Sequence, residues 1–369
     1  MRKRVVFQII ANLDVGGAER VAVSISSSKS DVVEHHVVEV MRGRSVFTEK
    51  ILAELKEKGI ICHRAFIPVL FHWHYLMEKM LALLFPFRFL MLYIKYRPCI
   101  VHCHTEIPDM AVWWSLLLMP WMKISVVRTI HNTRLWSGMN VIGPRVERFM
   151  QKNKANIAIS SNVQEAYHDA YGQIPPIIYN GVSPVSQVRY EGLLPGKKNI
   201  LFAGRFEEQK GISTLCEIIQ RMKGDADYHF HVFGSGRLQH LVDELRGMDN
   251  VTVRPPLHDI SSRLASFDYV IMPSLHEGLS ILALESSFNG VPLMINHCAG
   301  LSDTLPEDWP LAVHGNDINE WMHLFKEVIP NVDRQNLVNK SREYVMSYYS
   351  MEKMQKEYES FYESKMKRL

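Results

Sequence analysis

The sequence predicts an α/β protein that consists of two doubly wound domains in series. Short apolar runs alternate with amphipathic stretches over residues 5–131, which is the pattern of a parallel sheet with helices on both faces. The alternation restarts at residue 198, after a stretch (182–198) that is rich in Gly, Pro and Ser and lacks periodicity. The predicted divisions are a first domain over residues 1–181, a second over 182–350 and a final helix over 351–369.

The composition is that of a globular protein and excludes several other classes. A chain of 369 residues has room for two or three domains of about 100–200 residues each. Apolar residues make up 47% and charged residues 22%, which excludes collagen, coiled coil and intrinsic disorder. The five cysteines are widely spaced and odd in number, as expected in the reducing cytoplasm. The net charge of +3 is too small to imply a nucleic-acid partner, and none is expected.

Five runs in the first domain are short, apolar and bounded by turn residues, so we expect them to be buried strands. They are residues 5–10, 35–41, 61–67, 99–104 and 124–131. Two stretches have helical periodicity, residues 18–28 and 48–59, and Gly59 is a typical helix stop. We expect the first run to be a buried strand and not a signal peptide, because Asn12 and Asp14 break it and no small-residue cleavage site follows.

The second domain repeats this pattern. Its expected strands are residues 198–206, 227–236, 251–256, 269–274 and 291–296. Residues 212–222 and 237–247 are expected to be helices, and residues 347–369 a single charged amphipathic helix. Ligands of open parallel sheets bind at the carboxyl ends of the strands, so two such sheets facing each other would form a cleft between the domains.

No run reaches the roughly 18–20 apolar residues that a membrane-spanning helix needs. The nearest candidates are residues 80–94, which Pro86 and Arg88 interrupt, and residues 110–122, which are too few. The chain is therefore not expected to cross a membrane.

A peripheral membrane contact is nevertheless expected. Residues 60–150 combine aromatic and Met-rich runs with ten Lys or Arg and only four Asp or Glu. Apolar faces flanked by cations are typical of elements that lie on an anionic membrane. The alternative is that these runs are core helices, but core helices have little use for Arg88, Lys95 and Arg97. We therefore expect a cytoplasmic protein that touches the inner face of the membrane.

Residues 273–292 contain two glutamates eight positions apart. On one continuous helix Glu277 and Glu285 would lie about 80° apart around the axis and about 12 Å apart along it, too far for a carboxylate pair. We expect instead that Glu277 and Gly278 lie in a loop, that Ser280 caps a helix, and that Glu285 lies inside this helix.

The first amides of this helix would form a phosphate site. The backbone N–H groups of Leu279, Ser280 and Ile281 would be left without helical partners and would point toward a ligand. The alternative, a capped core helix with two solvated glutamates, has equal weight on chemistry alone.

A second polar loop follows the strand in residues 202–211. It carries Arg205 and Lys210, and two cations at the carboxyl end of a strand suit a diphosphate. The alternative is a solvated loop in which Arg205 pairs with Glu207 or Glu208.

Two glycine turns are weaker signals. Gly234 lies in a strand-to-helix turn that lacks the third glycine of a dinucleotide fingerprint, and Gly16 and Gly17 lie in the turn after the first strand. Each allows a ligand to approach closely, or is a plain tight turn.

The histidines of the first domain do not predict a metal site. Strand alternation places His102 and His104 on one face, but no third ligand follows at a suitable spacing. We expect His104 to form hydrogen bonds at the mouth of the cleft.

Together these segments resemble glycosyltransferase family 4, the retaining nucleotide-sugar glycosyltransferases of GT-B fold. The segments that carry the resemblance are GGAER, VHCH, TIHN, YNGV, AGRFEEQKG, FGSGRLQ, PSLHEGLSILALESS and GVP, in this order between residues 16 and 292. The resemblance implies two Rossmann-like domains that face each other across a cleft, the first on the acceptor side, and a final helix that crosses back to the first domain.

The resemblance also implies roles for single residues. Arg205 and Lys210 would hold the donor diphosphate, Glu285 the ribose and Glu277 the transferred sugar, with His104 near the reaction centre. The expected catalytic residues are His104, Arg205, Lys210 and Glu277. The expected donor-binding residues are Gly16, Gly17, Arg205, Lys210, Gly234, Glu277, Gly278, Leu279, Ser280, Ile281 and Glu285.

The expected function is retaining transfer of a hexosyl group from a nucleotide-diphosphate sugar, with UDP as the expected nucleotide. The acceptor would be a glycan or a lipid-linked sugar in the synthesis of bacterial O-antigen, capsule or lipopolysaccharide. Cations and helix-end amides would stabilise the leaving phosphate, so neither a metal ion nor another cofactor is expected. The alternatives are a nucleotide-sugar epimerase of the same fold and a non-catalytic, membrane-associated sugar-binding protein.

Overall fold

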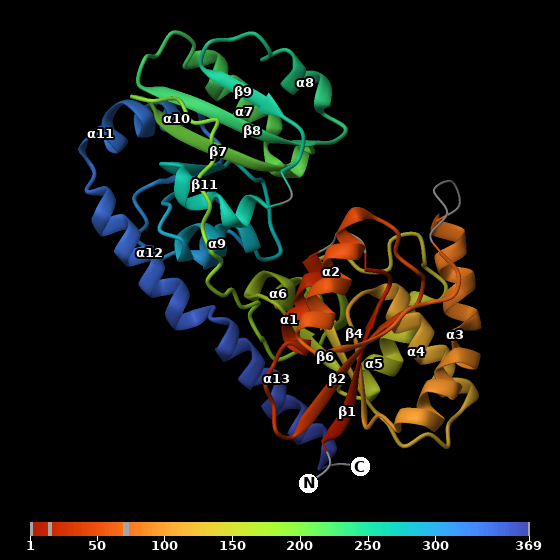
Figure 1. The fold of residues 1–369 in the computed structure, drawn as a ribbon. Coiled ribbons are helices and arrows are strands. Elements are labelled where there is room, and N and C mark those ends of the chain that lie inside the picture. Colours follow the sequence, from red (N-terminus) through yellow and green to blue (C-terminus); the bar gives the residue numbers. More distant parts are fainter. Residues whose placement is uncertain (1–2, 14–16, 69–73, 258, 368–369) are drawn as a thin grey trace. The chain divides into compact units, whose positions relative to one another are not determined.

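The computed structural model describes residues 3–13, 17–68, 74–257 and 259–367 (Figure 1). The chain forms two compact units. Unit 1 comprises Met1–Asn180 and Met351–Leu369, and unit 2 comprises Gly181–Ser350. Each unit has its own parallel sheet and its own core, and each is described by itself.

The sheet of unit 1 has six parallel strands in the order β3-β2-β1-β4-β5-β6. Its strands are β1 (Arg4–Ile10), β2 (Val33–Glu39), β3 (Ile61–His63), β4 (Ile100–Cys103), β5 (Ser125–Ile130) and β6 (Asn156–Ala158). All five strands expected in this domain are confirmed, and β6 is an additional edge strand. The central strand β1 is buried from Val5 to Ile10, which is typical of a parallel sheet that helices cover on both faces.

The helices of unit 1 are α1 (Gly17–Ser26), α2 (Val46–Glu57), α3 (His74–Tyr96), α4 (Glu106–Leu118), α5 (Gly143–Lys152), α6 (Ser161–Tyr171) and α13 (Met351–Met366). The helices expected at residues 18–28 and 48–59 are α1 and α2. Ser45 caps α2, because its Oγ accepts a hydrogen bond from the Thr48 N–H at 3.3 Å. Gly59, with φ +68°, follows this helix.

On the sequence alone Arg88 is a cation for which a core helix has little use, and this expectation is wrong. Arg88 lies on α3, but its guanidinium turns inward and donates to the carbonyl oxygens of His63 at 2.6 Å and Arg64 at 3.1 Å, and also to that of Glu39. It satisfies backbone oxygens after β2 and β3 and is not a surface cation, whereas Lys95 and Arg97 are exposed.

The tail is two helices and not the single one expected from residue 347. Helix α12 (Arg334–Tyr348) belongs to unit 2, and α13 begins at Met351. The break arises because Tyr349 and Ser350 leave the helix to meet Val182, whose N–H donates to the Tyr349 carbonyl oxygen at 2.8 Å.

Helix α13 packs on the sheet of unit 1. Its Tyr358 and Tyr362 are fully buried, and the Tyr362 hydroxyl accepts a hydrogen bond from Gln8 of β1 at 3.0 Å. The Tyr358 hydroxyl lies 2.9 Å from the Thr129 hydroxyl of β5. The aromatic side of the tail helix therefore completes the core of unit 1.

The sheet of unit 2 also has six parallel strands, in the order β12-β11-β10-β7-β8-β9. Its strands are β7 (Lys198–Arg205), β8 (Tyr228–Ser235), β9 (Val251–Arg254), β10 (Tyr269–Met272), β11 (Leu293–His297) and β12 (Ala312–His314). The five expected strands are confirmed, and β12 is additional. Both sheets thus have the doubly wound order 3-2-1-4-5-6 counted from their own first strand, which reverses between β1 and β4 and between β7 and β10.

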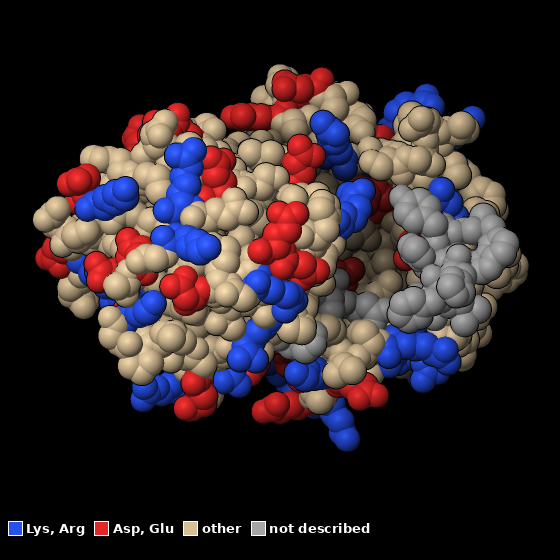
Figure 2. All heavy atoms as spheres, turned by 90° about the horizontal axis from the view of Figure 1, so that it is seen from above, with Lys and Arg blue, Asp and Glu red and all other residues tan. Residues whose placement is uncertain are grey.

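The helices of unit 2 are α7 (Ile212–Arg221), α8 (Gln239–Asp243), α9 (Ile281–Phe288), α10 (Ile318–His323), α11 (Ile329–Asn331) and α12. The helix expected over residues 237–247 is shortened to α8, and the chain after it forms turns that end at Gly247 with φ +89°. On the face that Figure 2 shows, basic and acidic side chains are interspersed, as the small net charge leads one to expect.

Within the described ranges, no helix has both the length and the apolar character that crossing a membrane requires.

Candidate functional site

In unit 2, two loops meet where the strand order reverses. The chain leaves β7 at Arg205 and forms a 3₁₀ turn over Glu208–Lys210, and it leaves β10 at Met272 before α9. The Leu275 N–H donates to the Gln209 carbonyl oxygen at 2.8 Å. The Gln209 side chain donates in turn to the carbonyl oxygen of His276 at 3.1 Å. These bonds hold the two loops that carry most of the expected site residues against each other.

Gly211 permits this close approach. Its φ is +66°, and a Cβ at this position would lie 1.8 Å from the carbonyl oxygen of Pro273. No larger residue fits here without moving one loop away from the other. The glycine at the end of the expected Arg205–Lys210 segment is therefore needed for loop packing.

Lys210 and Glu277 form an ion pair between the two loops. The Lys210 Nζ lies 2.6 Å from Oε1 and 2.9 Å from Oε2 of Glu277, and the Ser274 hydroxyl donates to Oε1 at 2.8 Å. Glu277 is buried, and the Lys210 side chain is 21% exposed. The structure thus brings together two expected catalytic residues and fixes the ammonium group in one position.

Three residues that the sequence did not single out support Glu277. The Asn296 amide donates to the Ser274 carbonyl oxygen at 2.9 Å, and the Asn316 N–H donates to Asn296 Oδ1 at 2.8 Å. A Cβ on Gly300, which has φ +75°, would lie 2.1 Å from the Glu277 carbonyl oxygen. The sequence signal that could have identified one of them is Asn296, the polar residue at the end of the apolar run of residues 291–296.

The cap of α9 is confirmed. The Ser280 Oγ accepts a hydrogen bond from the Ala283 N–H at 3.3 Å, and the helix begins at Ile281. Glu285 lies inside the helix and is buried, with the Ser261 hydroxyl donating to its Oε2 at 2.5 Å. The alternative with two solvated glutamates is wrong, because both Glu277 and Glu285 are buried.

The first turn of α9 follows Glu277 directly. Gly278 is half-buried, Leu279 is buried and Ile281 is half-buried. The N-terminus of a helix has backbone N–H groups without helical partners and a partial positive charge, both of which favour an anion.

Arg205 lies at the exposed end of β7. Its side chain forms no hydrogen bond or ion pair with the residues that the structure describes, and Glu207 pairs with Arg237 instead, at 3.0 Å. The alternative in which Arg205 pairs with Glu207 or Glu208 is therefore wrong.

The glycines that were expected to bind the donor have different surroundings from one another in the structure. Gly234 is buried and pairs with Gly204 across β7 and β8, and its Cβ would lie 2.1 Å from the Gly204 carbonyl oxygen, so sheet packing explains this glycine. Gly17 begins α1, and a Cβ there would have no neighbour within 4 Å among the described residues. Gly16 lies outside the described residues.

In unit 1, a pocket of about 400 Å³ lies where the strand order reverses, after β1 and β4. Its lining mixes polar and apolar groups, and the charged groups among the described lining residues are three carboxylates and one ammonium group. The described lining residues are Ala11, Asn12, Glu19, Glu78, Lys79, Thr105, Glu106, Ile107, Ser137 and Met139.

His104 lies next to this pocket, but its ring is buried. Its Nε2 donates to Gln8 Oε1 at 2.7 Å, and its Nδ1 lies 3.4 Å from Nε2 of His131. Burial lowers the pKa of His104 well below its ordinary value, so its imidazole is neutral at physiological pH. Its hydrogen-bonding role is expected from the sequence, but its partners come from within its own sheet.

His102 shares the face of His104, as strand alternation predicts, with ring centroids 4.2 Å apart. Its two nitrogens lie 2.7 Å from the Tyr362 hydroxyl and 2.7 Å from the Thr129 hydroxyl. Across the described part of the chain, no three His, Cys, Asp or Glu side chains are grouped as metal ligands would be.

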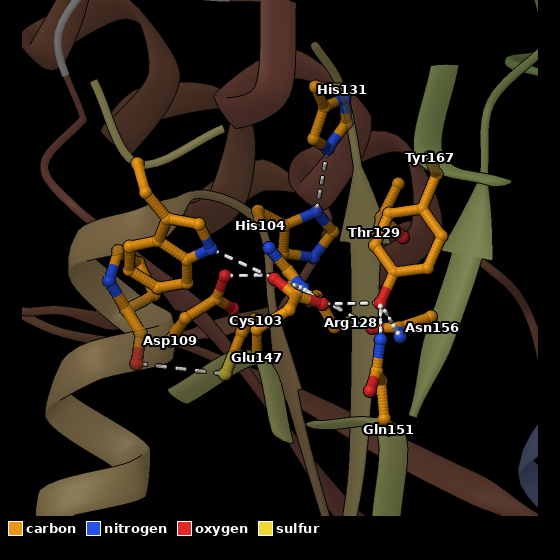
Figure 3. A network of polar contacts seen from close by, with 12 residues as sticks. Cys103, His104, Asp109, Arg128, Thr129, His131, Glu147, Gln151, Asn156 and Tyr167 are labelled. Atoms are coloured by element: carbon orange, nitrogen blue, oxygen red, sulfur yellow. Dashed lines mark hydrogen bonds and ion pairs between the residues drawn. The ribbon is translucent and has the colours of Figure 1, made fainter. Parts of the chain in front are cut away.

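Sequence reasoning missed a buried ion cluster beside these histidines (Figure 3). The Arg128 guanidinium on β5 lies 2.8 Å from Asp109 of α4 and 2.8 Å from Glu147 of α5, and all three side chains are almost fully buried. The Trp136 indole donates to Glu147 at 2.8 Å, and the Tyr167 hydroxyl also donates to Glu147. The cluster anchors two helices to the sheet, and an arginine within an apolar strand was its only sequence signal.

Burial sets the charge of this cluster. It raises the pKa of Asp109 to about 8, against the opposing effect of Arg128. Asp109 therefore holds a proton over much of the neutral range.

Two family models match the chain. Residues 15–185 match "Glycosyltransferase Family 4", and residues 197–331 match "Glycosyl transferases group 1". Among curated proteins, the D-inositol 3-phosphate glycosyltransferase of Paenarthrobacter aurescens is 29% identical over 153 residues. That match spans 38% of this chain and 38% of the relative, so the chain matches well under half the length of that protein.

Solved structures resemble the whole chain. A glycosyltransferase of Rickettsia africae has a TM-score of 0.75 at 16% identity and is matched over 100% of both chains. Anabaena Alr3699/HepE, solved in complex with UDP and glucose, has a TM-score of 0.74 at 14% identity over 98% of this chain and 100% of the other. With two doubly wound sheets and two adjacent family matches, the chain belongs to the glycosyltransferases of family 4 (group 1), which have the GT-B fold.

Proposed function

We propose that the protein is a retaining, metal-independent glycosyltransferase that moves a hexosyl group from a UDP-linked sugar to a glycan or lipid-linked acceptor. The observation that carries this proposal is the Lys210–Glu277 pair beside the N-terminus of α9, at the strand-order reversal of unit 2. The UDP complex of Anabaena Alr3699/HepE, which has the same fold, supports the choice of nucleotide.

The chemistry requires stabilisation of a leaving diphosphate. The bond between the anomeric carbon and the β-phosphate oxygen breaks, the acceptor hydroxyl oxygen bonds to the same face of that carbon, and the hydroxyl proton passes to the leaving phosphate. Negative charge therefore develops on the β-phosphate. Arg205, Lys210 and the first amides of α9 are the groups of unit 2 suited to stabilise it. In this scheme Glu277 holds the Lys210 ammonium in place and lies beside the transferred sugar.

The acceptor is assigned to the pocket of unit 1. Three carboxylates and one ammonium group line it, and carboxylates accept hydrogen bonds from sugar hydroxyls. The same carboxylates repel a phosphate group. We therefore propose an acceptor that presents neutral hydroxyls to this pocket, as the uncharged sugars of a surface polysaccharide do.

The proposed location is the cytoplasm, at the inner face of the membrane. All five cysteines are free thiols, which suits a reducing compartment. Bacterial surface polysaccharide synthesis, as O-antigen, capsule or lipopolysaccharide, is the proposed pathway.

The experiment is a screen of UDP- and GDP-sugars by thermal shift, followed by transfer assays with the stabilising donor. A ligand at 100 times its dissociation constant adds about 2.7 kcal/mol to the free energy of unfolding. The proton NMR spectrum of the product should show the anomeric configuration of the donor, and EDTA should leave the rate unchanged. An inverted anomer would reject the retaining mechanism, and a new nucleotide sugar formed without acceptor would identify an epimerase.

A further inference from the structure

Helix α3 is apolar on two opposite faces. One face packs into the core of unit 1 through Ala82, Phe85, Phe89 and Tyr93, which are all buried. The opposite face is exposed, from 45% at Leu83 to 75% at Phe87. Its residues are Met80, Leu83, Leu84, Phe87, Met91 and Ile94. At about 100° per residue they fall in one stripe about 100° wide, so the exposure is a continuous face and not a scatter.

Further apolar side chains are exposed at and just after the end of α4. Helices α3 and α4 pack beside each other in unit 1 (Figure 1), and the rings of Tyr93 and Trp121 meet at 5.8 Å. Leu117, Leu118 and Trp121 are each more than half exposed there. We call these three residues and the six exposed residues of α3 the α3–α4 patch.

The exposed charges at the end of the α3–α4 patch where α3 and α4 finish are all positive. Lys95, Arg97 and Lys123 are exposed at the end where α3 and α4 finish, and none of them forms an ion pair with a described residue. Lys95 lies over the Tyr96 ring at 5.1 Å, and Arg97 over the Tyr93 ring at 5.5 Å. Residues 79–105 and 110–146 contain no Asp or Glu.

We infer that the α3–α4 patch is a docking surface for an anionic lipid bilayer. Soluble proteins rarely expose a contiguous apolar patch of more than a few hundred Å² without a partner. Apolar side chains flanked by cations, with Trp and Tyr near the polar boundary, suit the headgroup region of an anionic membrane. Charge complementarity favours anionic lipid over a second copy of the chain, because two copies would bring Lys95, Arg97 and Lys123 of each together.

The position of the surface gives it a purpose that rests on the proposed function. Lys79 lines the pocket of unit 1 and is followed directly by Met80, the first residue of the α3–α4 patch. A bilayer against α3 would therefore hold the head of a lipid-linked acceptor near the rim of that pocket.

The test is flotation of the full-length protein with vesicles of phosphatidylcholine, with and without phosphatidylglycerol. The wild type should float with the anionic vesicles and lose binding as salt rises. The triple variant Leu84→Glu, Phe87→Glu, Met91→Glu should lose binding by about tenfold or more. The matched control Ile174→Glu, Val188→Glu, Met346→Glu changes three exposed apolar residues elsewhere and should float like the wild type.

A second pair of variants tests the charges. Lys95→Glu with Lys123→Glu should weaken binding to anionic vesicles, whereas Lys223→Glu with Lys326→Glu, which makes the same charge change in unit 2, should not. Melting temperatures should stay at the wild-type value, because all substituted residues are exposed.

Three outcomes would overturn the inference. The wild type could stay in the soluble fraction with anionic vesicles at low salt, or the triple variant and its control could lose binding equally. Sedimentation velocity could also show a dimer that the triple variant dissociates, which would make the patch an interface between copies. None of these outcomes touches the donor site, because nucleotide-sugar binding is measured separately without vesicles.

Discussion

The two sheets have the same strand order but carry different chemistry where that order reverses. After β7 and β10 of unit 2, the loops present Arg205, Lys210 and the capped start of α9. After β1 and β4 of unit 1 lies a pocket whose charged groups, among the described residues, are three carboxylates and one ammonium group on helices α1, α3 and α4. A shared topology therefore fixes where a ligand binds, and the charges on the loops and helices around that place decide which ligand it is.

The two units also differ in where they place ionisable groups. Lys210 of unit 2 is 21% exposed, and Arg205 is exposed outright, so both are accessible to a ligand. The Arg128 and Asp109 side chains of unit 1 are each only 1% exposed. Buried charged groups that are hydrogen-bonded hold helices and strands together, whereas accessible charged groups are available to bind a ligand.

The largest effect is expected in the buried cluster. Arg128→Met would leave Asp109 and Glu147 buried without their cation, and breaking such a pair costs about 3–5 kcal/mol. The matched surface variant is Arg263→Met, which removes a pair with Asp259 at 2.9 Å and should change the stability far less, because solvent screens an exposed pair. Urea denaturation of both variants measures the difference. Equal losses of unfolding free energy in the two variants would mean that the buried cluster of unit 1 contributes no more to stability than the surface pair of unit 2.

The next effect concerns the accessible cations. Arg205→Ala and Lys210→Ala should each lower the rate of sugar transfer about 100- to 1000-fold, as expected when one group that stabilises developing charge is removed. Glu285→Ala should also lower the rate, because the expected contact with the ribose is lost. Lys223→Ala, an exposed lysine of the same unit, should keep the wild-type rate. Near-normal turnover by a folded Arg205→Ala protein would reject the assignment of the diphosphate to this loop.

The sequence predicted those helices, strands and caps that depend only on residues close together in the chain. The apolar run of β1 and the cap at Ser280 each depend on a few adjacent residues, and both are confirmed. The edge strands β6 and β12 have three residues each, too few to show any periodicity. The break at Tyr349 was missed because its cause is Val182, which is distant in the sequence.

The same distinction applies to the candidate site. The pairing of Lys210 with Glu277 joins residues 67 positions apart. The sequence motifs therefore identified both residues but could not predict that they are in contact. The Arg128 cluster gave almost no signal, because a buried arginine in an apolar strand is recognisable only through its partners on α4 and α5. Burial of His104 was likewise invisible, since Gln8 and His131 come from other strands or loops.

A comparable effect tests the close approach of the loops in unit 2. Gly211→Ala meets the Pro273 carbonyl oxygen at 1.8 Å and keeps a φ of +66°, so it should destabilise unit 2 by strain and overpacking, each about 1–3 kcal/mol. Gly224→Ala has φ +82° but no described neighbour within 4 Å, so it should show the strain alone. Denaturation and transfer assays on both variants separate the two contributions. Identical behaviour would show that the loops do not need the glycine for packing.

The smallest effect is a pH dependence that arises in unit 1. The folded state holds a proton on Asp109 up to a pKa of about 8, whereas the unfolded chain loses it near 3.8, so the free energy of unfolding falls as pH rises toward 8. Burial lowers the pKa of His35 to about 4 and that of His131 to about 3. Below about pH 6.5 the unfolded chain binds protons that these folded histidines do not, so stability also falls as pH decreases.

The two opposing slopes place the greatest stability of the wild type between them, close to neutral pH. Asp109→Asn should remove the decline between pH 6.5 and 8, which amounts to at most about 1.4 kcal/mol per pH unit. It should steepen the acidic decline between pH 6.5 and 5, because the proton on Asp109 opposes that decline in the wild type. Asp169→Asn makes the same substitution at an exposed position of α6 and should follow the wild-type curve. Urea denaturation at pH 5, 6.5 and 8 is the measurement. Parallel curves for wild type and Asp109→Asn would mean that Asp109 is ionised throughout, and that burial does not raise its pKa.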